Sequence, residues 1–302
     1  MRCSPPCSPL SVSRPQTEAR QFEPCARNLY PRLVISTQHQ EIAKSAAFTL
    51  SKYVHPIYVE GKNVTPFLVG SGILLRVAED VFLITAAHVV DENRDNAIYT
   101  IGQFGTTPLE GRFYRNASEL KDHSDEPFDI GVLHLNAETT IALGRVTELL
   151  PIQCASAQSR PTRRLHLIIG YPHTKNRKLD FRRKKVFPKT FRYYSLLASA
   201  KRHVSLGVDT ATHLLLDFER RHVMPFGGHD QTAPHPAGVS GGAVWTNCFG
   251  EPKLVAILTD WKHRDSFLAV RMSLAIEMIR QVIPQSAHLL PPQTVRIHFD
   301  KS

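Results

Sequence analysis

Three short segments carry side chains that together could make a nucleophile. His88 ends the run LITAAH, Asp129 lies at the start of FDIGVLHL, and Ser240 lies among glycines in PAGVSGGAVW. A serine hydroxyl is a poor nucleophile at neutral pH until a neighbouring base removes its proton, and a histidine held by a carboxylate can be that base. Each residue alone is a weak signal, because a histidine or aspartate near a strand is more often structural. Taken together, the three predict covalent catalysis by acyl transfer.

In the order histidine, aspartate, serine, the three segments resemble the trypsin-like serine peptidases, in particular the bacterial and intracellular branch of that superfamily. Two further segments carry the resemblance: Gly70-Ser71-Gly72 before an apolar stretch, and Ile169-Gly170-Tyr171-Pro172 where a second barrel would open. The resemblance covers approximately residues 53–283. It implies an all-β, chymotrypsin-like fold of two six-stranded antiparallel β-barrels, with a short N-terminal helix and a C-terminal helix.

The resemblance also implies a role for each residue of the site. His88 is the general base, and Asp129 accepts the other imidazole N–H, fixes the tautomer and stabilises the imidazolium. Ser240 becomes the acyl carrier, while the backbone N–H groups of Gly238 and Ser240 form the oxyanion hole. The implied function is a serine endopeptidase that acts on protein or peptide substrates without a metal or other cofactor.

The residue before the serine departs from the family pattern. Secreted members have an aspartate there that pairs with a newly cleaved N-terminal amine, whereas this chain has Val239. That ion pair cannot form, so we expect an active site that forms without N-terminal processing.

Three residues are expected to contact the substrate. Pro234 is six residues before the serine, where the family reads the substrate side chain, and it cannot supply a carboxylate to a basic group. Thr259, 19 residues after Ser240, matches the strand whose backbone pairs with substrate in the family. Asp260 leaves two alternatives, because a carboxylate turned into the pocket would favour basic side chains, whereas an outward one leaves a small or apolar pocket. We favour the second.

Residues 177–194, RKLDFRRKKVFPKTFRYY, form a basic insert in the second half of the chain. Its cations and aromatic rings could bind the phosphates and bases of single-stranded nucleic acid, but the same alternation describes an amphipathic β-hairpin. The alternative to an enzyme is a protease-fold module that binds nucleic acid or a protein partner through this insert. We favour the enzyme.

An esterase and a metal site are two further alternatives. The same three residues hydrolyse esters, but the strand-turn-helix setting and the order serine, aspartate, histidine of the α/β-hydrolases are absent from the sequence. The 15 histidines raise the alternative of a metal site, since histidine is a common metal ligand. Pairs such as His203 with His213, or His229 with His235, lack a recognised ligand spacing with cysteines, so we predict no metal.

The elements that must position these residues are predicted to be mostly strands. From Tyr53 onward, short apolar runs alternate with glycine, proline, asparagine and aspartate, which is typical of all-β structure. Helical spacing of apolar residues predicts a helix at 38–51 and another over MSLAIEMIRQVI, which Pro284 ends. The expected strands are 67–77, 81–86, 97–103, 128–135, 164–170, 213–218, 243–247 and 253–259.

The chain is expected to divide into two lobes with tails. The proline-rich, aperiodic residues 1–36 predict a disordered tail or a misassigned start of translation. We expect a first lobe at 37–150 that carries His88 and Asp129, a second at 151–284 that carries Ser240, and a tail at 285–302.

Composition restricts the class of protein. With 42% hydrophobic and 21% charged residues in 302, the chain matches globular proteins, and its net charge of +10 attracts acidic surfaces without specificity. The sequence shows neither a secretory signal nor a membrane-spanning stretch, so we expect no membrane association and a cytoplasmic protein. A bridge between Cys154 and Cys248 is one alternative, but two separate thiols in a reducing compartment are the preferred interpretation.

Overall fold

The computed structural model describes residues 37–61, 65–91, 96–102, 105–115, 128–145, 147–157, 165–176, 188–220, 232–262 and 265–295. These residues belong to one compact unit, Thr37–Ser302. The expected N-terminal tail, residues 1–36, lies outside the described residues, as do residues 177–187 of the basic insert and the end of the C-terminal tail.

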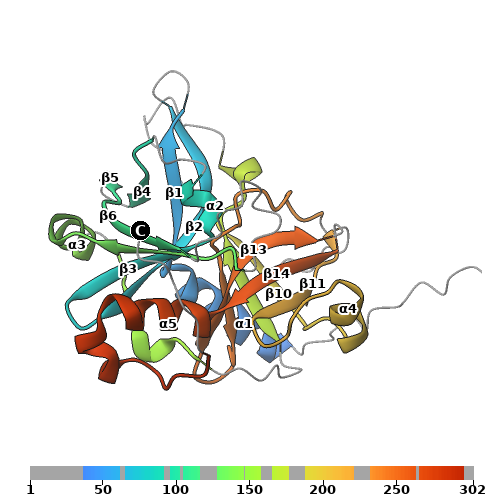
Figure 1. Ribbon diagram of the computed structural model, residues 1–302. Coiled ribbons are helices and arrows are strands. Elements are labelled where there is room, and N and C mark those ends of the chain that lie inside the picture. The colour runs from blue at the N-terminus through green and yellow to red at the C-terminus, as the bar shows by residue number, and fades with distance from the viewer. Residues whose placement is uncertain are drawn as a thin grey trace, which may run out of the picture. The chain divides into compact units, whose positions relative to one another are not determined.

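The first sheet is built from the first half of the described chain (Figure 1). Its strands follow the order β5-β4-β1-β2-β3-β7-β6, all antiparallel, and the two-residue β8 pairs with β2 in parallel. The sheet therefore has eight strands where six were expected. The strands are β1 (Val54–Glu60), β2 (Pro66–Val77), β3 (Asp80–Thr85), β4 (Tyr99–Gly102), β5 (Gly105–Pro108), β6 (Gly111–Arg115), β7 (Gly131–Leu135) and β8 (Leu150–Pro151).

The second sheet has the expected six strands and is antiparallel throughout. Its order is β10-β9-β12-β13-β14-β11. The strands are β9 (His166–Gly170), β10 (Phe191–Ser195), β11 (His213–Asp217), β12 (Ala243–Thr246), β13 (Lys253–Lys262) and β14 (Ser266–Arg271). The expected mostly-β architecture with two antiparallel sheets is thus confirmed.

The two sheets share one core and each also has its own. In β3, Leu83 joins the cluster inside the first sheet, while its neighbour Ile84 joins the shared cluster. In β9, Ile168 joins the cluster of the second sheet, while Ile169 faces the shared one. Successive strand residues point to opposite faces, so these strands are apolar on both faces and contribute to both cores.

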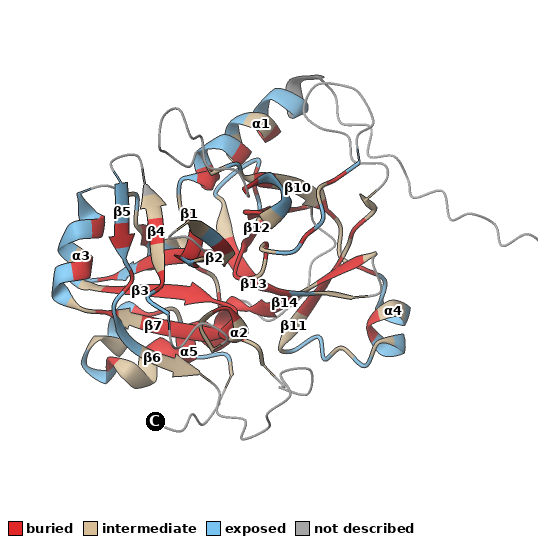
Figure 2. Ribbon diagram, turned by 90° about the horizontal axis from the view of Figure 1, so that it is seen from above, coloured by how far each residue is buried: buried red, intermediate tan, exposed pale blue. Residues whose placement is uncertain are grey.

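Five helices cover the described part of the sheets: α1 (Thr37–Ser51), α2 (Ala87–Asp91), α3 (Ala137–Gly144), α4 (Ala200–Ser205) and α5 (Met272–Val282). Helix α5, dark red in Figure 1, buries eight consecutive residues from Met272 to Ile279 and contacts β7 of the first sheet and β13 of the second. Each fully buried apolar side chain there contributes about 1.5–3 kcal/mol. The C-terminal helix therefore packs against both sheets, whereas α3 and α4 carry mostly exposed residues (Figure 2).

Candidate active site

His88 and Asp129 meet because they occupy adjacent ends of two paired strands. Strand β3 ends at Thr85 and helix α2 begins at Ala87, so His88 lies in the first turn of the helix. Asp129 comes two residues before β7, and Thr85 of β3 pairs with Gly131 of β7. In an antiparallel pair, the residues after one strand and before its neighbour lie at the same edge of the sheet.

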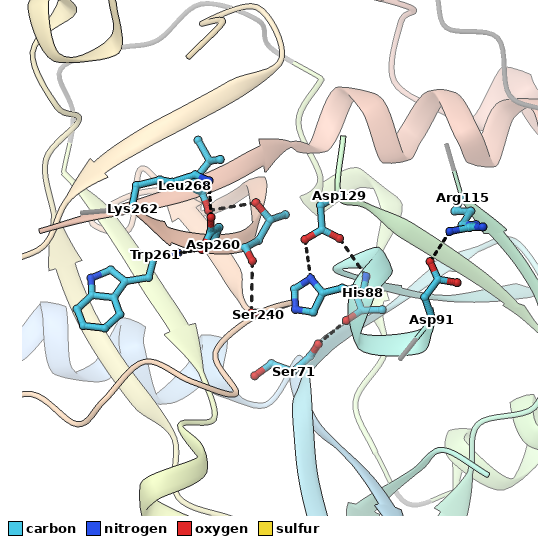
Figure 3. Close-up of polar contacts among 12 residues, drawn as sticks. Ser71, His88, Asp91, Arg115, Asp129, Ser240, Asp260, Trp261, Lys262 and Leu268 are labelled. Atoms are coloured by element: carbon cyan, nitrogen blue, oxygen red, sulfur yellow. Dashed lines mark hydrogen bonds and ion pairs between the residues drawn. The ribbon is translucent and has the colours of Figure 1, made fainter. Parts of the chain in front are cut away.

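The Asp129 carboxylate contacts both His88 groups that can orient the imidazole. His88 Nδ1 donates to Asp129 Oδ2 at 2.6 Å, and the His88 backbone N–H donates to Asp129 Oδ1 at 3.0 Å (Figure 3). A carboxylate on Nδ1 favours the proton there and leaves Nε2 as the basic nitrogen of the neutral ring. The side chains are 23% and 18% exposed, so the contact is partly shielded from water.

Ser240 approaches this pair from the second sheet. Figure 3 shows the His88 imidazole between Asp129 and Ser240. The Ser240 hydroxyl donates to the Thr259 carbonyl at 3.4 Å and makes no hydrogen bond to His88. The hydroxyl proton must therefore turn from the Thr259 carbonyl toward Nε2 before His88 can take it. Such hydrogen bonds commonly form only when substrate is bound.

The glycines around Ser240 have the backbone conformations that this turn needs. Gly238 and Gly241 have φ of +90° and +81°, in the region that favours glycine. A Cβ on Gly241 would lie 1.8 Å from the Ser71 carbonyl oxygen. No other residue fits there, because the turn packs directly against the backbone of β2.

Two backbone N–H groups beside the Ser240 hydroxyl have no acceptor among the described residues, those of Gly238 and Ser240. The Ala237 carbonyl accepts from His173 N–H at 2.7 Å, and the Val239 carbonyl accepts from Gly242 N–H at 2.8 Å. The C=O and N–H of one trans peptide point in opposite directions. Both unpaired N–H groups are therefore turned away from those partners, as donors to a developing oxyanion must be.

Val239 anchors the turn by apolar packing. Its side chain is 2% exposed and belongs to the core cluster of the second sheet, and a Cβ on Gly170 would lie 2.7 Å from Val239 Cγ1. The position where the resemblance led us to look for an ionic anchor is thus held here by burial against β9. This packing needs no newly cleaved amine.

A pocket of about 190 Å³ adjoins Ser240. Val239, Leu258 and Phe267, each at most 2% exposed, form apolar walls, and His235, Asp260 and Trp261 also line it. Pro234 and Thr259, which the sequence suggested for substrate contact, are not among its lining residues. His235 and Pro236 take that part of the wall.

The Asp260 carboxylate is engaged outside the apolar part of the pocket. Its Oδ1 accepts the Trp261 backbone N–H at 2.5 Å, and its Oδ2 pairs with Lys262 Nζ at 2.6 Å. About half of the side chain, 48%, is exposed. These contacts favour the outward one of the two alternatives, but Asp260 also lines the pocket, so its orientation toward substrate stays a prediction.

Two contacts near the site were not predicted from the sequence, because each joins residues that are distant in the chain. Arg115 Nη1 pairs with Asp91 Oδ2 at 2.6 Å, which ties β6 to the helix that carries His88 (Figure 3). Phe128, next to Asp129, stacks on His213 of β11 with ring centroids 6.0 Å apart. Burial lowers the pKa of His213 to about 4, so the ring is neutral at pH 7 and packs as an uncharged partner of the loop.

The aromatic side chains in the described part of the basic insert, residues 188–194, pack against neighbouring elements. Phe191 is buried, Tyr193 packs against Phe218, and the Tyr194 hydroxyl donates to the Ala43 carbonyl of α1. Arg192 Nε donates to Ser51 Oγ at 2.7 Å. These aromatic rings pack around β10, and binding of nucleic acid by residues 177–194, the alternative that we did not favour, is left untested by these contacts.

Cys154 and Cys248 are free thiols, in agreement with the preferred prediction of two separate thiols instead of a bridge between them. Across the described ranges, no cluster of three His, Cys, Asp or Glu side chains could hold a metal ion; His229 lies outside those ranges. In the same part of the chain, no helix has the length and apolar character to cross a membrane.

Comparison with known proteins identifies the fold. No protein-family model and no curated protein sequence matches the chain. Neuropsin, a serine protease expressed in the limbic system of mouse brain, matches in structure at a TM-score of 0.52 and 11% identity, over 77% of this chain and 95% of neuropsin. AL20, a thermostable serine protease from an extremophilic microorganism, matches at a TM-score of 0.43 and 12% identity, over 72% and 90% of the two chains. The fold is that of the chymotrypsin-like serine proteases.

Proposed function

We propose that this protein is a serine endopeptidase with His88, Asp129 and Ser240 as its catalytic residues and with the Gly238 and Ser240 N–H groups as its oxyanion hole. The observation that carries the proposal is the Asp129 carboxylate, which accepts from both the Nδ1 and the backbone N–H of His88. The protease fold adds support, since its members act on protein or peptide substrates.

The proposed reaction has two halves. His88 Nε2 takes the Ser240 proton while Oγ bonds to the substrate carbonyl carbon, and the resulting oxyanion accepts from the Gly238 and Ser240 N–H groups. The imidazolium then gives its proton to the leaving amine as the C–N bond breaks, which leaves an acyl-enzyme. A water molecule repeats the same proton transfers, releases the acid and restores Ser240.

A fluorophosphonate probe tests the proposal, because it phosphonylates a serine only when a neighbouring base activates the hydroxyl. We expect stoichiometric labelling of the folded protein, and peptide mass mapping should assign the adduct to Ser240. Heat-unfolded protein serves as the control and should not react. An adduct on another serine, or no adduct on active protein, would contradict the assignment.

The pocket beside Ser240 predicts a preference for apolar side chains in the residue whose carbonyl is attacked. Apolar walls discriminate by about 10-fold or more between a fitting hydrophobic group and a charged one, and the Asp260 charge is already paired with Lys262. Cleavage-site sequencing of an unbiased peptide library measures this preference. Asp260→Asn should leave the profile unchanged. A profile dominated by lysine and arginine that Asp260→Asn abolishes would show the opposite orientation of the carboxylate.

We also propose that the protein acts in the cytoplasm and that residues 37–150 and 151–284 are its two lobes. Two free thiols suit a reducing compartment, and the strands of the two sheets come from 54–151 and 166–271. Recovery of the protein from the secreted fraction of its source cells would argue against the cytoplasm.

A further inference from the structure

Ser71 of β2 uses all its polar groups on segments that meet at the nucleophile turn. Its backbone N–H donates to the Ser240 carbonyl at 2.8 Å, and its hydroxyl donates to the Gly238 carbonyl at 2.9 Å. The hydroxyl oxygen accepts the Tyr171 N–H at 2.9 Å, and the Ser71 carbonyl accepts the Thr85 hydroxyl at 2.7 Å. Ser71 is 0% exposed, so water cannot replace any of these partners.

These contacts join both lobes to the turn. Ser71 and Thr85 belong to the first sheet, whereas Tyr171 follows β9 of the second sheet. A hydroxyl has one proton to donate, and the Tyr171 N–H occupies one side of the oxygen, so the Ser71 proton is directed to Gly238. The hydroxyl orientation is therefore set before any substrate arrives.

The two carbonyls that Ser71 holds flank the Val239–Ser240 peptide. That peptide carries the Ser240 N–H, one of the two unpaired donors, and the adjoining Gly238 carries the other. Each backbone carbonyl in a fixed direction restricts the planes of the neighbouring peptides. Holding the Gly238 and Ser240 carbonyls thus limits the directions that both oxyanion N–H groups can take. The His173 N–H adds a second restraint, because it holds the Ala237 carbonyl of the peptide that carries the Gly238 N–H.

Close packing makes the serine hard to replace at this point. A Cβ on Gly170 would lie 3.3 Å from Ser71 Oγ, and a Cβ on Gly241 would lie 1.8 Å from the Ser71 carbonyl oxygen. The hydroxyl is enclosed by backbone from both lobes. Its loss leaves a buried carbonyl and a buried N–H without a partner, and the turn must shift to satisfy them.

We propose that Ser71 is a positioning residue that preforms the oxyanion hole by fixing the Gly238 and Ser240 carbonyls, an inference that rests on the proposed peptidase function. It acts through the turn and does not touch the reacting atoms. It also explains why the turn needs no cleaved N-terminus: hydrogen bonds from β2 and burial of Val239 hold it in place.

Ser71→Ala tests this, with Ser51→Ala as the matched control. Ser51 is also buried, donates to a carbonyl (Ala47, 2.6 Å) and accepts an N–H (Arg192 Nε, 2.7 Å), but it lies in α1. We expect Ser71→Ala to lower kcat about 10-fold, with KM and the pH dependence of kcat/KM unchanged. Ser51→Ala should keep kcat. An unchanged kcat in Ser71→Ala, or an equal fall in both variants, would overturn the proposal.

Amide hydrogen exchange gives a readout that does not depend on catalysis. The Val239, Gly241 and Gly242 N–H groups are hydrogen-bonded within the turn or to β13, and they should exchange about 10-fold faster in Ser71→Ala but not in Ser51→Ala. If the wild type hydrolyses no peptide, the proposed function fails and this comparison alone decides the role of Ser71. If Ser71→Ala does not fold, Ser71→Cys replaces it as the test variant, because the thiol keeps a weak donor. This variant should show a smaller fall in kcat and a smaller increase in the exchange rates of the same amides. Equal exchange in the Ser71 and Ser51 variants overturns the proposal.

Discussion

Asp129→Asn is expected to lower kcat for peptide hydrolysis by about 10,000-fold, the size of loss seen when a triad aspartate becomes an amide. The asparagine amide can donate to His88 Nδ1, which would favour the tautomer with its proton on Nε2, where the base is needed. The side chain is isosteric, so the fold and KM should change little. Steady-state kinetics measures the loss of kcat, and thermal unfolding of the same variant checks that the fold is unchanged.

The chain contains its own control for this prediction. Asp80 Oδ1 lies 2.8 Å from His134 Nε2 on the paired strands β3 and β7, which makes a second aspartate–histidine pair away from Ser240. Asp80→Asn should therefore keep kcat. Because triad residues act as a unit, the double variant of Asp129→Asn with Ser240→Ala should be no slower than Ser240→Ala alone. Full activity in Asp129→Asn would show that the Asp129 carboxylate does not orient the base.

Gly238→Ala is expected to lower kcat by about 100- to 1,000-fold, the cost of losing one oxyanion donor. The new Cβ would lie 2.8 Å from the Tyr171 carbonyl oxygen and 2.9 Å from the His173 nitrogen, and φ is +90°. The turn must move, which carries the Gly238 N–H away from the oxyanion. Kinetics on a series of peptide substrates should show the loss in kcat rather than in KM.

Gly207→Ala separates this effect from backbone strain. Gly207 also has a positive φ, +63°, but a Cβ there would meet nothing within 4 Å. This variant should lose about 1–2 kcal/mol of stability, the cost of a left-handed backbone for a residue with a Cβ, and keep kcat. Equal activity of the two alanine variants would mean that the Gly238 N–H does not contribute to the reaction.

Local patterns were sufficient for the fold class and for the most regular elements. Two apolar runs, one around Leu74 and one around Leu83 and Ile84, predicted β2 and β3 almost to the residue. The apolar stripe before Pro284 predicted α5. Strand β1, VHPIYVE, was not expected. It is buried on both faces and therefore lacks the alternation that marks a half-exposed strand.

The extra strands of the first sheet had no comparable signal. Strand β8 has two residues, and Leu150 becomes a strand residue only because it pairs with Leu75 of β2. The same holds for β5, GTTP, whose glycine and proline ends are poor strand formers and whose pairing with β4 creates the element. Tertiary contacts decided these elements.

The sequence by itself determined which side chains were available for chemistry: a histidine and an aspartate in one half, a serine among glycines in the other, and a valine where an ionic anchor would stand. These follow from residue type and order, which no packing can change. Only the tertiary structure decided that Asp129 contacts His88 through both oxygens, that Asp260 turns to Lys262, and that Ser71 holds the turn. Such contacts join residues up to 167 positions apart, and their directions depend on how two sheets pack rather than on any local pattern.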